Sequence, residues 1–255
     1  MKHLFKPIEG RAERGTGQMP QNGAALRRPD AHPTKIRILD AAEELFAARG
    51  YHGVSIREIT QMANVEVALA HYHFGSKEEL FRHVVTRRID EHCSRLIEDL
   101  DRAQAAAPNG IAPVEEIVRA FCRFSFAKTS SADAGWKRYL QLLARTSQLP
   151  MYEPVLAPIN RPYGIIVVRY SEALRAALPT IQPGNLATAF YMLQGIVSRL
   201  LAETEMLERQ SHGLCSASDF DSHLERLVPF VAAGFYALAG RPELISARNG
   251  SEPPT

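Results

Sequence analysis

The residues best suited to bind a charged partner lie close together, between Glu66 and Lys77. Tyr72 and His73 carry hydrogen-bond donors and Lys77 carries a cation, so these three side chains suit phosphate oxygens. His71 and His73 are two positions apart, which on a helix directs the rings to different sides and excludes an i, i+4 metal pair. We therefore expect this stretch to bind a phosphate-bearing surface and to hold no metal.

No group of residues in the sequence predicts catalysis. Neighbouring glutamates at 43–44 and at 115–116 are expected on helix surfaces, where such pairs are solvated. There is no Ser-His-Asp order with a nucleophile elbow. Cys93, Cys122 and Cys215 are too widely spaced to indicate a disulfide framework or a metal cluster. We expect no enzymatic activity, no catalytic residue and no cofactor, and a reducing cytoplasm as the location.

Two short helices joined by a tight turn must position the residues around His71. The pattern Ser55-x-x-Glu58 is a capping box that predicts a helix start, and the same pattern recurs at 76–79. Asn64 interrupts the first apolar stripe, and Asn tolerates the left-handed backbone that a tight turn needs. The spacing therefore predicts a helix-turn-helix at about residues 55–74.

An amphipathic helix from about Thr34 to Arg49 precedes the motif, with Gly50 as its left-handed stop. Its apolar stripe can cover the buried sides of the two motif helices. A three-helix domain over residues 34–90 results.

The most specific pieces of this domain are Gly50-Tyr51, Val54-Ser55-Ile56, Ala63 with Val65, Tyr72-His73-Phe74 and Ser76-Lys77-Glu78. With these pieces the sequence resembles the N-terminal DNA-binding domain of the TetR/AcrR family of bacterial regulators. The resemblance implies that the second motif helix lies in the DNA major groove and that the protein acts as a dimer. The sequence departs from the family pattern at Asn64, where Gly is usual, at Glu66, where Ser or Thr is common, and in the apolar run 67–70.

The resemblance and the chemistry of the side chains together assign roles within the motif. The expected DNA-binding residues are Ser55, Arg57, Glu66, Val67, Leu69, His71, Tyr72, His73 and Lys77. Carboxylates can accept from cytosine amino groups, apolar side chains can meet thymine methyls, and an imidazole can donate to guanine, so Glu66, Val67, Leu69 and His71 are expected at base edges. Tyr72, His73 and Lys77, with Ser55 and Arg57, are expected at the sugar-phosphate backbone. For Glu66, interaction with the helix dipole is an equal alternative.

The ends of the chain are expected to lack fixed structure. Residues 1–33 are rich in Gly, Pro, Arg and Gln and form a basic arm, and residues 241–255 form a flexible tail. Arg27 and Arg28 are candidates to reach a minor groove, although a solvated tail is the simpler interpretation. The formal net charge of the whole chain is only +2, so any DNA contact must be local.

Residues 91–240 read as a helical domain, which makes the predicted fold class all-α. One long helix from Lys77 to about Ala105 is expected to join the N-terminal domain to this bundle. Further helices are expected at about 113–126, 135–148, 162–178, 184–209 and 218–239, with a proline-rich break over 149–162. No apolar run is long enough to span a membrane.

The bundle has two expected roles, dimerisation and the binding of a small apolar or amphipathic effector. The expected interface residues are Leu193, Val197, Leu200, Leu201, Leu224, Val228, Val231 and Phe235. The expected pocket residues are Phe121, Trp136, Tyr139, Tyr163, Tyr170, Phe190 and Gln194. The alternative for the apolar stripes is that they only fill the core of one chain.

These expectations combine into a ligand-responsive, homodimeric transcriptional regulator, a repressor of a pseudo-palindromic double-stranded DNA operator. The alternative from another class is an all-helical enzyme or lipid-binding protein in which the helix-turn-helix is incidental. A well-formed motif and the lack of a catalytic constellation favour the regulator.

Overall fold

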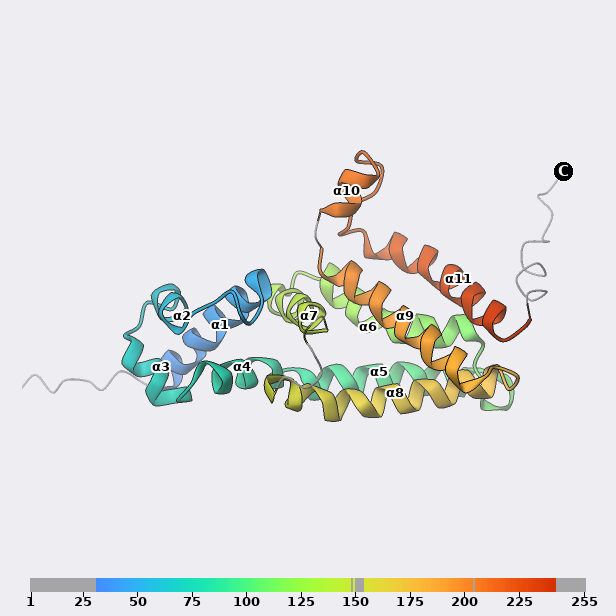
Figure 1. The fold of residues 1–255 in the computed structure, drawn as a ribbon, viewed down its shortest axis with the longest axis horizontal. Helices are drawn as coiled ribbons and strands as arrows, with labels where there is room; N and C mark the ends of the chain where they lie inside the picture. Colours follow the sequence, from blue (N-terminus) through green and yellow to red (C-terminus); the bar gives the residue numbers. More distant parts are fainter. Residues whose placement is uncertain (1–30, 148, 150–153, 204, 242–255) are drawn as a thin grey trace, which may run out of the picture.

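The computed structural model describes residues 31–147, 149, 154–203 and 205–241, and these residues form helices, turns and loops without a strand. Its α-helices are α1 (Ala31–Arg49), α2 (Ile56–Met62), α3 (Val67–Phe74), α4 (Lys77–Thr86), α5 (Ile89–Ala106), α6 (Val114–Ser130), α7 (Ala134–Thr146), α8 (Ala157–Ala177), α9 (Pro183–Leu201), α10 (Met206–Gln210) and α11 (Phe220–Leu238). Short 3-10 turns occur at η1 (Pro108–Gly110) and η2 (Pro154–Leu156). The predicted all-α fold class is confirmed. Figure 1 shows α1–α4, the N-terminal region, at one end and α5–α11, the C-terminal bundle, at the other.

The N-terminal region has its own apolar core. Ile38 and Phe46 on α1 are buried against Ile59 of α2 and Phe81 of α4. The rings of Phe46 and Phe81 meet edge to face with their centroids 5.1 Å apart. This core packs α2 and α3 against α1.

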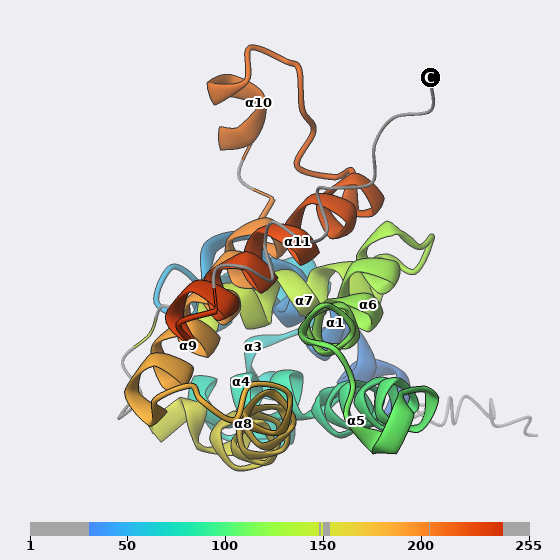
Figure 2. The ribbon, with the colours of Figure 1, turned by 90° about the vertical axis from the view of Figure 1, so that its right-hand side faces the viewer.

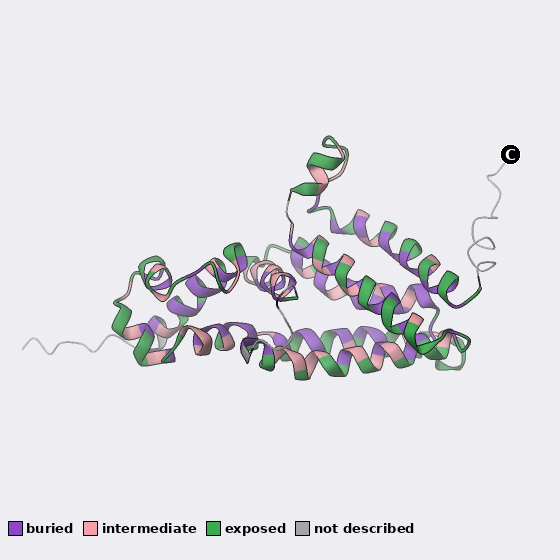
Figure 3. Ribbon diagram, viewed as in Figure 1, coloured by how far each residue is buried: buried purple, intermediate pink, exposed green. Residues whose placement is uncertain are grey.

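The C-terminal bundle packs α6 between α5 and α11, while α8 lies along α5 and α9 completes the far side (Figure 2). Figure 3 shows the buried faces of these helices turned towards one another and the exposed faces turned outwards. Phe121, Tyr170 and Phe190 join α6, α8 and α9 at ring-centroid distances of 5.2 to 6.2 Å. Burial of such large aromatic side chains stabilises the bundle.

Helix α7 packs on both regions. Its Leu142 belongs to the core of the N-terminal region, whereas Leu140 belongs to the core of the bundle. The Tyr139 hydroxyl donates a hydrogen bond of 2.9 Å to the backbone carbonyl of Val85, near the end of α4. Movement of α4 against the bundle must therefore disturb α7.

The prediction of one continuous helix over 77–105 is wrong. The chain forms α4 and α5 instead, and Arg88 between them leaves the helical conformation, with φ −132° and ψ 0°. The guanidinium of Arg87 lies 2.8 Å from the Asp40 carboxylate, and that of Arg88 lies 3.6 Å from the Glu43 carboxylate, so both arginines of the break contact α1. Because the apolar periodicity continues across the break without Gly or Pro, sequence pattern does not reveal it.

Two other predicted helices also differ. The helix expected over 184–209 is split into α9 and α10, and Glu203 and Glu205 between them have positive φ angles of 42° and 53°. Helix α8 begins before the predicted start at Pro162 and keeps that proline inside. Among the described residues, no helix is both long and apolar enough to cross a membrane.

Candidate DNA interface and effector cavity

Helices α2 and α3 form the predicted helix-turn-helix. Ser55 caps α2: its Oγ accepts from the Glu58 backbone N–H at 3.3 Å, and the Glu58 carboxylate accepts from the Ser55 backbone N–H at 2.8 Å. Asn64 occupies the left-handed region with φ 51°, as the turn requires, and Gly75 ends α3 with φ 73°. The local signals in this stretch and the geometry agree.

The loop before α2 requires a glycine at position 53. A Cβ built at Gly53 would lie 2.5 Å from the Arg49 carbonyl oxygen, a distance that backbone atoms cannot relieve without moving the loop. A larger residue at this position would displace the start of α2 from α1. The close approach therefore sets the angle at which the motif is presented.

One face of α3 is open to solvent. The exposed positions in and next to this helix are Glu66, Val67, Ala68, His71 and Tyr72. Tyr72 is 80% exposed, while Ala70 and Phe74 on the opposite side are buried and Leu69 is half-buried. Of the residues predicted to face base edges, Glu66, Val67 and His71 thus lie on the open face and Leu69 lies at its margin.

His71 has a defined ring orientation. Its Nδ1–H donates a hydrogen bond of 2.9 Å to the Gly75 carbonyl, because a carbonyl oxygen can only accept. In the neutral ring Nε2 is then an acceptor, and it donates only when the ring is doubly protonated. With Nδ1 bound to the Gly75 carbonyl, the predicted donation to guanine requires the doubly protonated ring, whereas the neutral ring suits acceptance from a base amino group.

The predicted backbone-contacting residues of α2 differ in availability. The Ser55 hydroxyl donates to the Glu58 carboxylate at 2.7 Å, and Arg49 binds the same carboxylate at 2.8 Å. These hydrogen bonds lower the pKa of Glu58 to about 2, so a negative charge stands at the start of α2. Ser55 is therefore engaged within the protein, while Arg57 is exposed and forms no ion pair with any described residue.

Two lysines lie near the C-terminal end of α3. The Lys77 ammonium lies 4.4 Å from the centre of the Tyr51 ring, and burial lowers the pKa of Lys77 while Glu58 opposes that effect. The Lys35 ammonium lies 5.7 Å from the centre of the Phe74 ring. Lys35 was not among the predicted residues, although its place at the start of the first helix, next to Thr34, could have indicated it.

His73 is half-buried beside Phe74. Arg27 and Arg28 lie outside the described residues.

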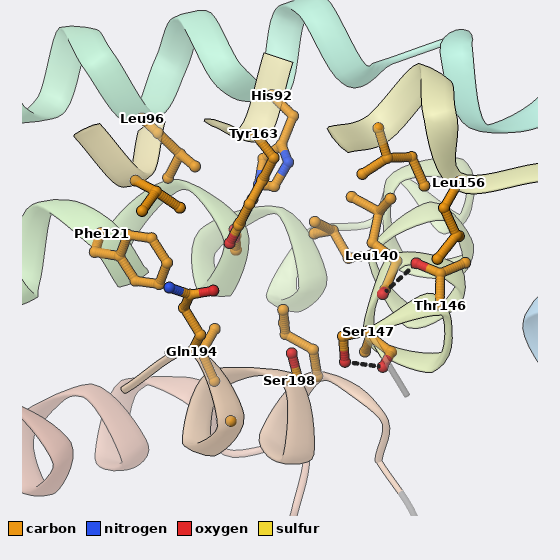
Figure 4. A pocket seen from close by; sticks show the side chains of 18 of the residues that line it. His92, Leu96, Phe121, Leu140, Thr146, Ser147, Leu156, Tyr163, Gln194 and Ser198 are labelled. Atoms are coloured by element: carbon orange, nitrogen blue, oxygen red, sulfur yellow. Dashed lines mark hydrogen bonds between the residues drawn. The ribbon is translucent and has the colours of Figure 1, made fainter. Parts of the chain in front are cut away.

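A cavity of about 870 Å³ opens between α5, α6, α7, α8 and α9 (Figure 4). Of the predicted pocket residues, Phe121, Tyr163 and Gln194 line it. Trp136, Tyr139, Tyr170 and Phe190 do not line it and lie in the surrounding core instead. The hydroxyls of Tyr139 and Tyr170 donate to the backbone carbonyls of Val85 and Leu96, which explains how they are buried without an unpaired polar atom.

A buried histidine in the cavity wall was missed by sequence reasoning. His92 Nε2 lies 3.0 Å from the Ser125 Oγ, and both residues line the cavity. Burial lowers the pKa of His92 to about 4, so the ring is neutral at neutral pH. Its Nδ1 has no hydrogen-bond partner among the residues that the structure describes. The signal was available in principle, since His92 and Ser125 both interrupt apolar helix faces.

The wall behind His92 connects the cavity to the N-terminal region. The ring centroids of His92 and Trp136 are 6.5 Å apart, and the Arg88 guanidinium lies 5.5 Å from the centre of the Trp136 ring. Arg88 in turn approaches Glu43, which is only 2% exposed. Burial raises the pKa of Glu43, an effect that Arg88, Arg87 and Arg138 oppose. Contacts therefore run from the cavity wall to α1.

The residues predicted to form the dimer interface are used inside one chain. Leu193, Val197, Leu201, Val228, Val231 and Phe235 are buried in the bundle core, and Leu200 and Leu224 pack partly buried against it. The six buried side chains are therefore corrected from interface to core, as the alternative interpretation of the apolar stripes expected, because their own chain already encloses them. Leu200 and Leu224 keep part of their surface, and their place in an interface stays a prediction.

The outer faces of α9 and α11 carry other apolar residues. Phe230 is 72% exposed and Met192 is 57% exposed, whereas Tyr191, which is 76% exposed, also lines the cavity. Gly195 and Gly234 are exposed on the same two helices and leave room for the close approach of another helix, although Gly195 lines the cavity as well.

These observations define a helix-turn-helix protein whose motif is packed onto a separate helical bundle with a cavity. Two family models match the chain: "Bacterial regulatory proteins, tetR family" over residues 38–84 and "Tetracyclin repressor-like, C-terminal domain" over residues 119–234. The chain belongs to the tetR family of bacterial regulatory proteins.

Curated relatives match only part of the chain. The HTH-type transcriptional regulator UidR of Escherichia coli (strain K12) is 31% identical over 72 residues, which are 28% of this chain and 37% of UidR. The HTH-type transcriptional activator FasR of Mycolicibacterium smegmatis is 33% identical over 90 residues, which are 35% of this chain and 40% of FasR. Each match spans well under half of the relative's length.

The solved structure of a mutant of the regulator HlyIIR is similar to the whole arrangement. It superposes with a TM-score of 0.51 at 19% identity and covers 80% of this chain and 95% of that chain. At this identity the similarity concerns the fold, in which a helix-turn-helix region is followed by a helical bundle.

Proposed function

We propose that the protein is a ligand-responsive, dimeric repressor that binds a pseudo-palindromic DNA operator through α3. The single observation that carries the proposal is the open face of α3 on a helix-turn-helix that starts at the capping box of Ser55, turns at left-handed Asn64 and ends at Gly75. A rigid, exposed helix of this kind is what entry into a major groove requires.

Within α3, Glu66, Val67 and His71 are proposed to face bases. The His71 Nε2 lone pair suits the amino group of adenine or cytosine, and Val67 suits a thymine methyl group. Tyr72 and His73 are proposed to bind phosphates, together with Arg57, Lys35 and Lys77. Phosphate contacts then set the position and base contacts the sequence preference.

The dimer is proposed to form through the outer faces of α9 and α11, around Met192 and Phe230. Exposed large apolar residues next to exposed glycines fit a close four-helix contact between two copies. A two-fold dimer carries two copies of α3, which accounts for a pseudo-palindromic operator.

The ligand response is proposed to pass through the wall of the cavity. A ligand that moves His92 acts on Trp136, which packs against Arg88 at the break between α4 and α5. Because α4 holds α3 through the N-terminal core, a small change at Arg88 alters the spacing of the two α3 helices in a dimer. Ligand and operator then weaken each other's binding by the same factor.

Fluorescence anisotropy with the DNA upstream of the protein's own gene, and with scrambled DNA of the same composition, tests the proposal. A specific regulator should bind the upstream duplex at least about 10³-fold more tightly than the scrambled duplex at physiological salt. Equal affinity for both would contradict it and favour the lipid-binding alternative. A promoter–reporter fusion decides the direction, since repression requires higher reporter output when the gene is deleted.

A further inference from the structure

The described wall of the cavity is almost free of charge. Its residues include no carboxylate and no lysine, and its single arginine, Arg199, is exposed to solvent. The remaining wall consists of apolar side chains and of uncharged polar ones from α5, α6, α7, α8 and α9. A charged group buried here would lose its hydration without gaining an ion partner from the described wall, which disfavours its binding.

Uncharged polar groups converge at the middle of the cavity. Figure 4 shows the Tyr163 hydroxyl and the Gln194 amide pointing towards each other from opposite walls, with His92 beside Tyr163. His92 Nε2 lies 3.0 Å from the Ser125 hydroxyl, and no described residue hydrogen-bonds the His92 Nδ1. Burial keeps the imidazole and the phenol neutral, because it lowers the pKa of His92 and raises the pKa of Tyr163. Four helices thus each contribute a neutral group.

We propose that the cavity takes an uncharged, largely apolar ligand and binds its hydrogen-bonding group between the His92–Ser125 pair, Tyr163 and Gln194. This inference rests on the proposed function, for which it names the class of effector. The three groups together offer donors and acceptors, so an alcohol, ketone or amide fits them. A carboxylate or an ammonium does not, since no described residue of the interior supplies a counter-charge.

Arg199 defines the competing arrangement, in which an anionic ligand leaves its acid group at the rim. An exposed guanidinium offers little to such a ligand because water screens the pair. The ligand's charge therefore separates the two arrangements in one experiment.

The test compares 1-decanol, decanoate and decylammonium, which share one chain length and differ in the charge of the head group. The chain has a single tryptophan, Trp136, whose ring lies 6.5 Å from that of His92, so its fluorescence reports filling of the cavity. Titrated at neutral pH, 1-decanol should bind at least about tenfold more tightly than either charged probe, as expected for an unpaired buried charge. Equal or tighter binding of decanoate, or no binding of 1-decanol up to its solubility limit, would overturn the proposal.

Two variants assign the contacts. Gln194→Leu should weaken 1-decanol binding by roughly 2- to 10-fold, as loss of one hydrogen bond implies. Gln182→Leu makes the same change at the other end of α9, outside the cavity, and should leave the affinity unchanged. Equal effects of the two variants would remove Gln194 from the site, and a decanoate affinity that falls in Arg199→Gln would establish the anionic arrangement instead.

The outcome is independent of DNA binding. If the protein selects its operator but prefers decanoate, the class of ligand is wrong and the proposed function stands. If it binds 1-decanol through Gln194 but does not distinguish operator from scrambled DNA, the ligand site stands and the proposed regulatory function fails.

Discussion

The guanidinium of Arg88 lies 3.6 Å from the carboxylate of Glu43, which links the point where the chain enters the bundle to the first helix of the N-terminal region. The same guanidinium lies 5.5 Å from the centre of the Trp136 ring. A Cβ built at Gly135 would come within 2.5 Å of its Nη2, so this glycine leaves room for Arg88 to adopt this position. Arg88 therefore contacts both parts that a ligand would have to couple.

Arg88→Met should lower the free energy of unfolding by roughly 1–3 kcal/mol, because it removes one of the cations that face the buried Glu43 carboxylate. Urea denaturation at pH 7 measures the change. Arg95→Met is the matched control, since Arg95 on α5 pairs with exposed Glu98 at 2.8 Å and should matter by less than about 1 kcal/mol. If the two variants were equally stable, the Glu43 contact would have no structural role.

The pH dependence of stability should contain a contribution from His92. Because burial lowers the pKa of His92 to about 4, from an ordinary value of 6.5, the unfolded chain binds more protons between these two pH values. The free energy of unfolding should therefore fall as the pH drops from about 7 to 4.5, with about 2 kcal/mol of the fall due to this residue.

His92→Gln removes that titration and should give a shallower pH profile than the parent protein. His52→Gln, at an exposed position, should keep the parental slope. A parental slope in His92→Gln would mean that the ring is hydrated and titrates normally, which would also weaken its role in the cavity.

Sequence reasoning succeeds where the physical cause is local. The start at Ser55, the turn at Asn64 and the stop at Gly75 depend on residues within one or two helical turns, and the structure has all three. The break at Arg88 depends on Glu43 in another helix, and no propensity near residue 88 records that contact.

The same limit explains why many of the predicted interface and cavity residues lie in the core instead. An apolar stripe such as that of Leu193 does not show whether its residues pack within one chain or against a partner. Here Leu193 is buried in the core, while the neighbouring Met192 is exposed. The presence of an aromatic residue in the sequence does not show whether its side chain lines a cavity or packs in the core. Tyr139 and Tyr170 instead direct their hydroxyls to backbone carbonyls at 2.9 and 2.7 Å.

Lys77→Ala should reduce the slope of log affinity against log salt by roughly one unit, on operator and scrambled DNA alike, if its ammonium neutralises one phosphate. Lys128→Ala provides a close control, because Lys128 also lies over aromatic rings, 5.8 Å from Phe124 and 5.5 Å from Trp136, but belongs to the bundle. An unchanged slope in Lys77→Ala would indicate that the contact with Tyr51 keeps this lysine from DNA.

Phe230→Glu should convert the dimer to a monomer in sedimentation velocity at micromolar concentration, since a carboxylate in an apolar interface loses its hydration. Leu214→Glu introduces the same charge at a residue that is 88% exposed in the segment between α10 and α11, and it should leave the dimer intact. A dimer that survives Phe230→Glu, or that is lost in Leu214→Glu, would move the interface away from the outer face of α11.

Base reading by the open face of α3 can be measured by selection from a randomised duplex pool. The unaltered protein should enrich a two-fold symmetric sequence, and His71→Ala, checked for folding by circular dichroism, should lose preference at one symmetric pair of positions, at about 1–3 kcal/mol per contact. His212→Ala, at an exposed position between α10 and α11, should enrich the same sequence as the unaltered protein. Enrichment of no sequence, or an identical sequence logo for His71→Ala, would contradict base reading by α3.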